Sequence, residues 1–292
     1  MRRTFLTAAS LLYISCATAV PTEDVGQRID AIIQRHPAQT IAVSYYDFAT
    51  GRELHRNEKV HFHAASTMKT PVMLGIFEAV SRGELRLDQP VKVKNDFVSI
   101  LDGSRYSLEA REDSDAELYD HIGQELPLRE LVRRMITRSS NLATNIVIEF
   151  IGAPRVMVLM KQIGATDIKV LRGVEDDKAY RAGMNNTTTS HDLMLIMRTL
   201  GEQKAISPEA SREMIEILSA QEHNDGIPSG LPKGTKVAHK TGSITAISHD
   251  AALVIPADRT SYVLVVLTRG FRKGDDADAV IRAISSAVWS WR

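Results

Sequence analysis

Strand-like segments stand near both ends of this sequence, and the long stretch between them carries helical patterns. In residues 40–47, the apolar side chains of Ile41, Val43 and Tyr45 recur at every second position, which is the period of a strand with a buried face. A second strand is expected after the turn at Thr50 and Gly51, but two strands alone are not stable, and the further candidates come only at residues 236–242, 249–255 and 261–268. The two ends of the chain are therefore predicted to meet in one sheet.

Helical patterns flank the strands and fill the middle of the chain. Residues 23–36 and 275–289 have apolar residues at helical spacing and are expected to lie across the sheet. The middle helices are predicted at residues 66–82, 128–136, 141–151 and 189–200, with another starting at Ser207 and Pro208. The expected fold class is α/β (α+β): an antiparallel sheet flanked by helices is built from both termini, and an all-helical lobe is inserted.

The domain boundaries follow from this division. Residues 20–62 and 221–292 are expected to form the α/β lobe, and residues 63–220 the helical lobe. Residues 1–19 are predicted to be a signal peptide, because Arg2 and Arg3 precede an apolar run and small residues follow it. The expected location is periplasmic or secreted. A lipoprotein acylated at Cys16, the only cysteine, is the alternative, although Tyr13 stands where such signals usually carry an aliphatic residue.

The charge balance limits the partners. The chain has 36 basic and 36 acidic residues, so it presents no net field to nucleic acid or to an anionic membrane surface. After the leader, no stretch approaches the eighteen or so uninterrupted apolar residues of a membrane span. A monomer that binds a small molecule in the cleft between its lobes is expected.

Ser66 and Lys69 form the first candidate catalytic pair. Three residues apart on a helix, their side chains would share one face, which would set a nucleophile beside a possible base. The backbone N–H groups of a helix start would also stabilise an oxyanion. A capping serine followed by a solvated lysine gives the same pattern without any function.

Two later segments add what this pair lacks. Ser139 and Asn141 lie in a short gap between predicted helices, where their side chains can project into a cleft. Near the end of a predicted strand, Lys240 supplies a cation and Thr241 a hydroxyl. The next two residues are Gly242, which allows close approach, and Ser243, which offers a backbone N–H.

These three motifs, in this order, resemble those of class A β-lactamases and of penicillin-recognising serine acyltransferases more broadly. The resemblance covers the whole mature chain. It implies that Ser66 is acylated, that Lys69 is its proton partner, and that Ser139 relays a proton to the leaving β-lactam nitrogen. It implies that Asn141 binds the amide side chain of the substrate and that Lys240 and Thr241 bind its carboxylate. The N–H groups of Ser66 and Ser243 would form the oxyanion hole, and neither a metal nor a cofactor is expected.

The chain departs from the family pattern in the loop at residues 172–186, which looks structureless and short. Glu175 is the candidate for the glutamate that activates the deacylating water. However, Lys178 and Ala179 occupy the region of the asparagine that helps to hold this water, and Asn186 stands where relatives often have an aspartate paired with the loop arginine.

The other departures from the family pattern and the remaining charged residues are expected to be structural. Ser140 replaces the acid of the second motif at a position that faces away from substrate, and no arginine follows Ser243 to supplement the carboxylate anchor. The acidic residues of 109–125 are expected to form a solvated face, and Glu175 with its neighbours could likewise be plain loop charges. His61 and His63 look structural because no third metal ligand accompanies them. His239 receives no role.

Three functions remain open from the sequence. The first is a serine β-lactamase that works through an acyl-enzyme on Ser66. The second is a D,D-peptidase or esterase-like enzyme that binds penicillin, acts on a peptidoglycan-like peptide and deacylates β-lactams slowly or not at all. The third is a non-hydrolysing sensor, which the lack of a membrane anchor disfavours.

Overall fold

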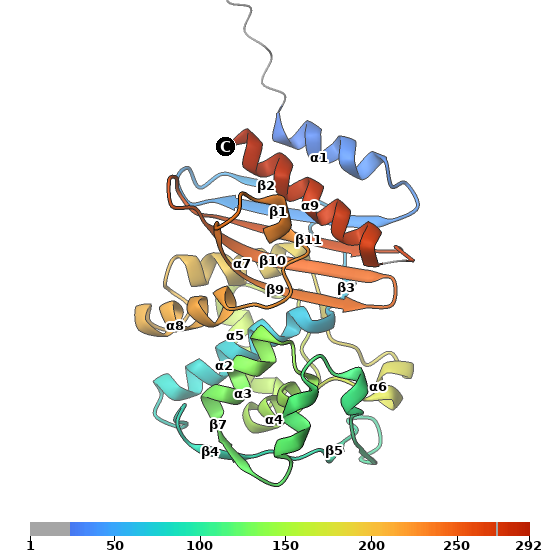
Figure 1. Ribbon diagram of the computed structural model, residues 1–292, viewed down its shortest axis with the longest axis vertical. Helices are drawn as coiled ribbons and strands as arrows, with labels where there is room; N and C mark the ends of the chain where they lie inside the picture. The colour runs from blue at the N-terminus through green and yellow to red at the C-terminus, as the bar shows by residue number, and fades with distance from the viewer. Residues whose placement is uncertain (1–23, 273) are drawn as a thin grey trace, which may run out of the picture.

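The computed structural model describes residues 24–272 and 274–292, and a five-stranded antiparallel sheet lies at its centre (Figure 1). The strand β1 (Thr40–Asp47) pairs with β11 (Tyr262–Arg269), so the two ends of the chain share one sheet, as predicted. The complete order across the sheet is β2 (Glu53–Arg56), β1, β11, β10 (Ile247–Ile255) and β9 (Lys236–Ile244). Its edge strand β9 borders the candidate site.

Two helices cover the outer face of the sheet (Figure 1). They are α1 (Val25–Gln34) and α9 (Gly274–Trp291), which bury Ile29 and Ile284 against Ile41, Val43 and Tyr45 of β1. The alternate residue Ala42 belongs to the other core cluster, on the opposite face of the sheet. Alternate residues of β1 therefore pack into two separate hydrophobic layers, one on each face of the sheet.

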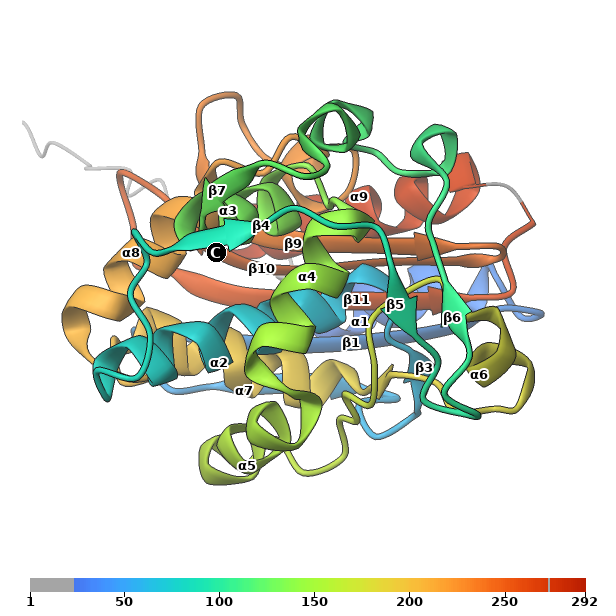
Figure 2. The same cartoon turned by 90° about the horizontal axis from the view of Figure 1, so that it is seen from below.

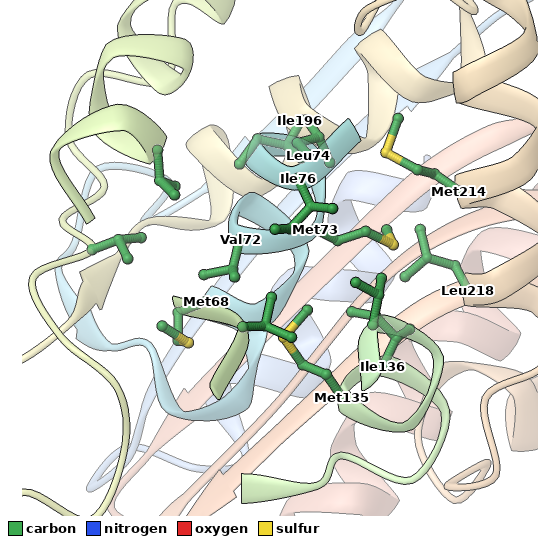
Figure 3. Close-up of a cluster of buried hydrophobic side chains, with 14 of the residues drawn as sticks. Met68, Val72, Met73, Leu74, Ile76, Met135, Ile136, Ile196, Met214 and Leu218 are labelled. Atoms are coloured by element: carbon green, nitrogen blue, oxygen red, sulfur yellow. The ribbon is translucent and has the colours of Figure 1, made fainter. Parts of the chain in front are cut away.

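The inner face of the sheet carries α7 (Ser190–Gly201) and α8 (Pro208–Ser219), and beyond them lies α2 (Lys69–Ser81). Every residue of α2 from Lys69 to Phe77 is buried, which requires neighbours on all sides. Seen from below, α4 (Asn141–Ile151) crosses α2 (Figure 2). Figure 3 shows the side chains that surround α2, drawn from α3 (Leu128–Thr137), α7 and α8: Met135, Ile136, Ile196, Met214 and Leu218.

The middle of the chain holds several elements that the sequence pattern did not predict. The helix α5 (Ala153–Ile163) follows α4 after a turn at Gly152, whose φ is 77°. Three short ribbons pair β3 (Phe62–His63) with β8 (Thr187–Thr188), β4 (Pro90–Lys92) with β7 (Glu125–Pro127), and β5 (Phe97–Val98) with β6 (Arg105–Tyr106). The 3-10 turns are η1 (Ala65–Met68), η2 (Ala110–Glu112), η3 (Ala116–His121) and η4 (Ile227–Gly230).

The predicted signal peptide, residues 1–19, lies outside the described residues. Among the helices of the described chain, none alone has the length and apolar character needed to cross a membrane. The consecutive helices α4 and α5 reach that length only as a pair, and they bend by 83° where they meet.

Candidate active site

Two adjoining cavities open between the edge strand β9 and the helical part of the chain. Their volumes are about 310 and 320 Å³, and both are lined by Ser66, Asn141 and Ser243. The first also contacts Ser139, Thr241 and Gly242, whereas the second contacts Glu175. The residues that the three motifs predicted are thus brought to one cleft, with Lys69 and Lys240 fully buried beside it.

Ser66 lies on the 3-10 turn η1 rather than on the predicted helix, which begins three residues later at Lys69. The residue before it, Ala65, has a φ of 45°, in the left-handed region that L-residues seldom adopt. This later helix start also explains why a proline is tolerated at position 71. The proline falls in the first turn of α2, where a backbone N–H would have no intrahelical acceptor.

The Lys69 amine is held by the second motif and not by Ser66. Its Nζ donates to the backbone oxygen of Ser139 at 2.5 Å, to Asn141 Oδ1 at 2.9 Å and to Ser139 Oγ at 3.2 Å. Within residues 24–272 and 274–292, no hydrogen bond joins Nζ to the Ser66 hydroxyl. Complete burial lowers the pKa of Lys69 to about 7, although the carboxylates of Asp113 and Glu175 oppose this shift.

Ser139 stands between two buried amines. Its Oγ receives hydrogen bonds from Lys69 Nζ at 3.2 Å and from Lys240 Nζ at 3.0 Å. A hydroxyl oxygen accepts two such bonds and still has one proton to donate, so the Ser139 proton is free for a group in the cleft. The φ of Ser139 is 58°, so its backbone is held in the left-handed region by its surroundings.

Lys240 reaches the cleft from β9. Besides Ser139, its Nζ contacts its neighbour's backbone oxygen, Thr241 O, at 2.9 Å. Burial and the nearby Lys69 lower the pKa of Lys240 well below its usual range, while Asp250 favours the charged form. His239, to which no role was assigned, binds this aspartate through Nδ1 at 2.9 Å. A carboxylate arriving in the cleft would further favour the charged form of Lys240.

Asp113 is a site residue that the sequence analysis missed. Its carboxylate accepts hydrogen bonds from the N–H groups of Asn141 at 3.0 Å and Leu142 at 2.8 Å, at the start of α4. Tyr119 OH donates to the same carboxylate at 3.1 Å. Asp113 therefore holds the loop that presents Ser139 and Asn141. Ser140, which replaces the acid of the family motif, is buried and caps α4 through the N–H of Ala143.

The prediction of a solvated acidic face at residues 109–125 is wrong for two of its members. Asp113 and Asp115 are buried, with 9% and 3% of their surface exposed. Asp115 accepts hydrogen bonds from Arg134 and Arg138 at 3.0 Å. The more exposed Glu117 also accepts hydrogen bonds from both arginines. The partners come from α3 and the residue after it, so the pairing depends on tertiary structure. No local pattern in the acidic stretch indicated it.

Gly242 brings β9 against the nucleophile turn. A Cβ atom at this position would lie 2.9 Å from the backbone nitrogens of both Ser66 and Thr67. Only a glycine permits this approach. Because β9 is an edge strand, part of its backbone has no strand partner and faces the cleft. The next residue, Ser243, is exposed there.

The loop at residues 172–186 is more ordered than predicted, since it contains the short helix α6 (Asp177–Arg181). Arg172 donates to Met184 O and to Asn185 Oδ1, both at 3.0 Å, and forms no ion pair with a carboxylate of the described chain. Asn186, which stands where relatives often have the paired aspartate, instead bonds the backbone of Arg172 through both ends of its amide. Hydrogen bonds to neutral groups thus stand where relatives often have an ion pair.

Glu175 faces the cleft beside Asn141. Its Oε1 accepts a hydrogen bond from Asn141 Nδ2 at 3.1 Å, and its own φ is 58°. Partial loss of contact with solvent and the negative charges of Asp177 and Glu112 raise the pKa of Glu175. The positive charge of Lys69 partly offsets this rise. Its neighbour Asp176 is buried and caps α6, which makes it a structural residue.

Two further contacts shape this loop. Asn145 of α4 anchors it by accepting from Val174 N at 2.6 Å and donating to Val174 O at 3.0 Å. Lys178 points outward to Asp102 at 2.8 Å, and Ala179 is buried. Neither residue therefore supplies the side-chain amide that, in relatives, helps to hold the deacylating water. Across the described residues, no group of three His, Cys, Asp or Glu side chains could hold a metal ion.

The fold and the cleft first define a mixed sheet-and-helix protein with an enzyme-like site around a serine. The sequence then matches the β-lactamase enzyme family over residues 24–291, so the chain belongs to this family, whose members are hydrolases. It is 24% identical over 302 residues to a β-lactamase of Bacteroides uniformis, covering 98% of each protein. It is 23% identical to the extended-spectrum β-lactamase PER-1 of Pseudomonas aeruginosa, covering 98% of this chain and 94% of that protein.

Two solved structures extend the comparison. The structure of PBP-A superposes with a TM-score of 0.79 at 25% identity, covering 91% of this chain and 95% of that one. A β-lactamase from Xanthomonas campestris also reaches 0.79 at 25% identity, with coverage of 92% and 98%. The chain is thus about equally similar in structure to a protein titled PBP-A and to one titled a β-lactamase.

Proposed function

We propose that this protein is a serine β-lactamase that opens the β-lactam ring through an acyl-enzyme on Ser66. The observation that carries the proposal is the bridging position of Ser139, whose hydroxyl accepts from both Lys69 and Lys240 and keeps its proton available beside Ser66. Ring opening of a cyclic amide requires a proton for the departing nitrogen, and this hydroxyl can supply it.

Acylation is proposed to use these groups. The Ser66 oxygen attacks the ring carbonyl carbon, and the neutral Lys69 amine, which a pKa of about 7 allows at neutral pH, takes its proton. This step requires Lys69 Nζ, which here contacts Ser139 and Asn141, to turn its lone pair towards Ser66 Oγ. As the carbon–nitrogen bond breaks, Ser139 gives its proton to the ring nitrogen and regains one from Lys69. The net change moves the Ser66 proton to the nitrogen. The N–H groups of Ser66 and Ser243 would stabilise the oxyanion, and Lys240 with Thr241 would bind the substrate carboxylate.

Deacylation needs a base for water, and Glu175 is the proposed one. Its carboxylate lines the second cavity together with Ser66 and binds the amide of Asn141 at 3.1 Å. A water molecule between Glu175 and the ester would attack the acyl carbon and give a proton to the carboxylate. The bond to Ser66 Oγ then breaks, and the proton that Glu175 took from the water returns to this oxygen as the product acid leaves.

A second candidate is a D,D-peptidase or esterase-like enzyme that forms a long-lived penicillin adduct. The hydrogen bond from Asn141 to Glu175 favours it, because one lone pair of the proposed base is occupied and neither Lys178 nor Ala179 has an amide side chain to hold water. A mutant of PBP-A, 26% identical to this chain with a TM-score of 0.78 and coverage of 91% and 95%, is titled an acyl-enzyme complex with penicillin G. The natural substrate would then be a peptidoglycan-like peptide, which suits the proposed export through residues 1–19.

The test is the hydrolysis of the chromogenic cephalosporin nitrocefin by purified protein. We expect many turnovers by the wild type, none by Ser66→Ala, and a burst of one product per chain in Glu175→Gln. A one-product burst by the wild type, with cleavage of a D-Ala-D-Ala peptide, would favour the second candidate. No acylation by any penicillin or cephalosporin would overturn both.

A further inference from the structure

His63 contacts the backbone immediately before the nucleophile. It ends the short strand β3, and its ring nitrogen Nδ1 accepts a hydrogen bond from the N–H of Ala65 at 3.0 Å. An acceptor on a side chain and a donor two residues later form the same link that an asparagine makes in an Asx-turn. This link closes the chain at Ala65, the residue with a φ of 45° that leads into Ser66.

The rest of the His63 residue is also held in place. Its backbone oxygen accepts from His249 Nε2 of β10 at 3.0 Å, and the next residue, Ala64, donates its N–H to Asn186 O at 2.8 Å. The ring packs against that of Tyr180 of α6 in a T-shaped arrangement, with centroids 5.8 Å apart. His63 therefore joins the nucleophile turn to the sheet and to the loop that carries Glu175.

The contact depends on the protonation state of the ring. An N–H can only donate, so Nδ1 must be bare and the neutral ring must carry its proton on Nε2. Burial and the nearby guanidinium of Arg172 lower the pKa of His63 and so favour this neutral form near pH 7. The other charged groups that share its cavity are Glu175, Asp176 and Asp177 on the loop, and β10 brings His249 to its backbone.

We propose that His63 is a positioning residue: its neutral ring holds Ala65 in the left-handed conformation that aims Ser66 into the cleft, and protonation of the ring breaks this contact. A protonated ring presents N–H at both nitrogens, so Nδ1 would meet the Ala65 N–H as two opposed donors. The turn would then relax, and the acylation rate would fall at acid pH. The inference deepens the proposed function, on which its kinetic part rests.

The kinetic test compares His63→Asn and His63→Leu in single-turnover acylation by nitrocefin between about pH 4 and pH 8. Asparagine can accept from the Ala65 N–H but does not titrate, so the rate at pH 7.5 should stay within about threefold of wild type. Leucine removes the acceptor and should slow acylation about tenfold or more, because a turn held only loosely misplaces the nucleophile.

The shape of the pH profile distinguishes positioning from a merely structural role. In the wild type, the logarithm of the rate should fall with a slope near one as Lys69 is protonated, and the slope should rise above one over the pH range in which His63 is also protonated. The slope for His63→Asn should stay near one. A slope that rises above one in that variant, or wild-type acylation by a folded His63→Leu, would overturn the proposal.

Nuclear magnetic resonance separates this inference from the proposed function, because it needs no substrate. The ¹⁵N shifts of the His63 ring should identify the Nε2-protonated tautomer at pH 7, and the Ala65 amide should shift as His63 titrates in the wild type but not in His63→Asn. The opposite tautomer, or an Ala65 amide that ignores the titration, would refute the positioning role even if every β-lactam were hydrolysed.

Discussion

The close approach of β9 to the nucleophile turn gives the sharpest mutational prediction, Gly242→Ala. The added Cβ would lie 2.9 Å from the nitrogens of Ser66 and Thr67, whereas ordinary contacts begin at 3.4 Å. The strand and the turn must therefore separate by about 0.5 Å, since neither backbone can rotate away. A displacement of 1 Å at a reacting group costs about a hundredfold in rate, so about a tenfold loss of acylation is expected.

The assay is stopped-flow acylation by nitrocefin together with thermal unfolding. Overpacking of this kind lowers the free energy of unfolding by about 1–3 kcal/mol. The control is Gly51→Ala, a turn position that lines neither cavity and has open space around it but a φ of 69°. It should lose about 1–2 kcal/mol of stability from backbone strain with unchanged acylation. A Gly242→Ala protein that acylates within twofold of wild type would refute the reasoning.

Three further predictions concern the groups around the cleft. Because burial lowers the pKa of Lys69 to about 7 and the neutral amine is the base, the single-turnover acylation rate should rise through about pH 7, and a flat rate from pH 5 to 9 would exclude this role. Asp113→Asn removes a negative charge that raises the pKa of Lys69, so the acid limb of that profile should move to lower pH, and buried donors left without an acceptor should cost about 1–3 kcal/mol each in unfolding experiments. Asn145→Ala removes both backbone contacts to Val174 and should increase amide hydrogen exchange in residues 172–186, while protection in the central sheet stays at the wild-type level.

The sheet and the main motifs could be predicted because their signals are local or ordered along the chain. Alternation in β1 and the apolar runs of β10 and β11 indicated strands whatever their partners were. Ser66 and Lys240 were singled out by motif order rather than by proximity. Their convergence through Ser139 Oγ is a property of the fold, and no sequence spacing measures it.

The residues that were missed act through contacts distant in sequence. Asp113 looked like one more acid in a charged stretch, and only the packing of that stretch against α4 brings it to Asn141 N, 28 residues away. Hydrophobic periodicity reports on side chains. It therefore could not reveal that a left-handed residue, Ala65, shifts the helix start to Lys69. The helix α5 was not predicted; Gly152 ends the helix before it, and Pro154 stands in its first turn.

Mass spectrometry after brief exposure to benzylpenicillin tests most directly whether Ser66 Oγ is the acylated atom in this cleft. We expect one penicilloyl group per chain, located on the peptide that contains Ser66 and absent from Ser66→Ala, with a lifetime that lengthens in Glu175→Gln. An adduct on another residue, or no adduct on a folded wild-type protein, would contradict this expectation.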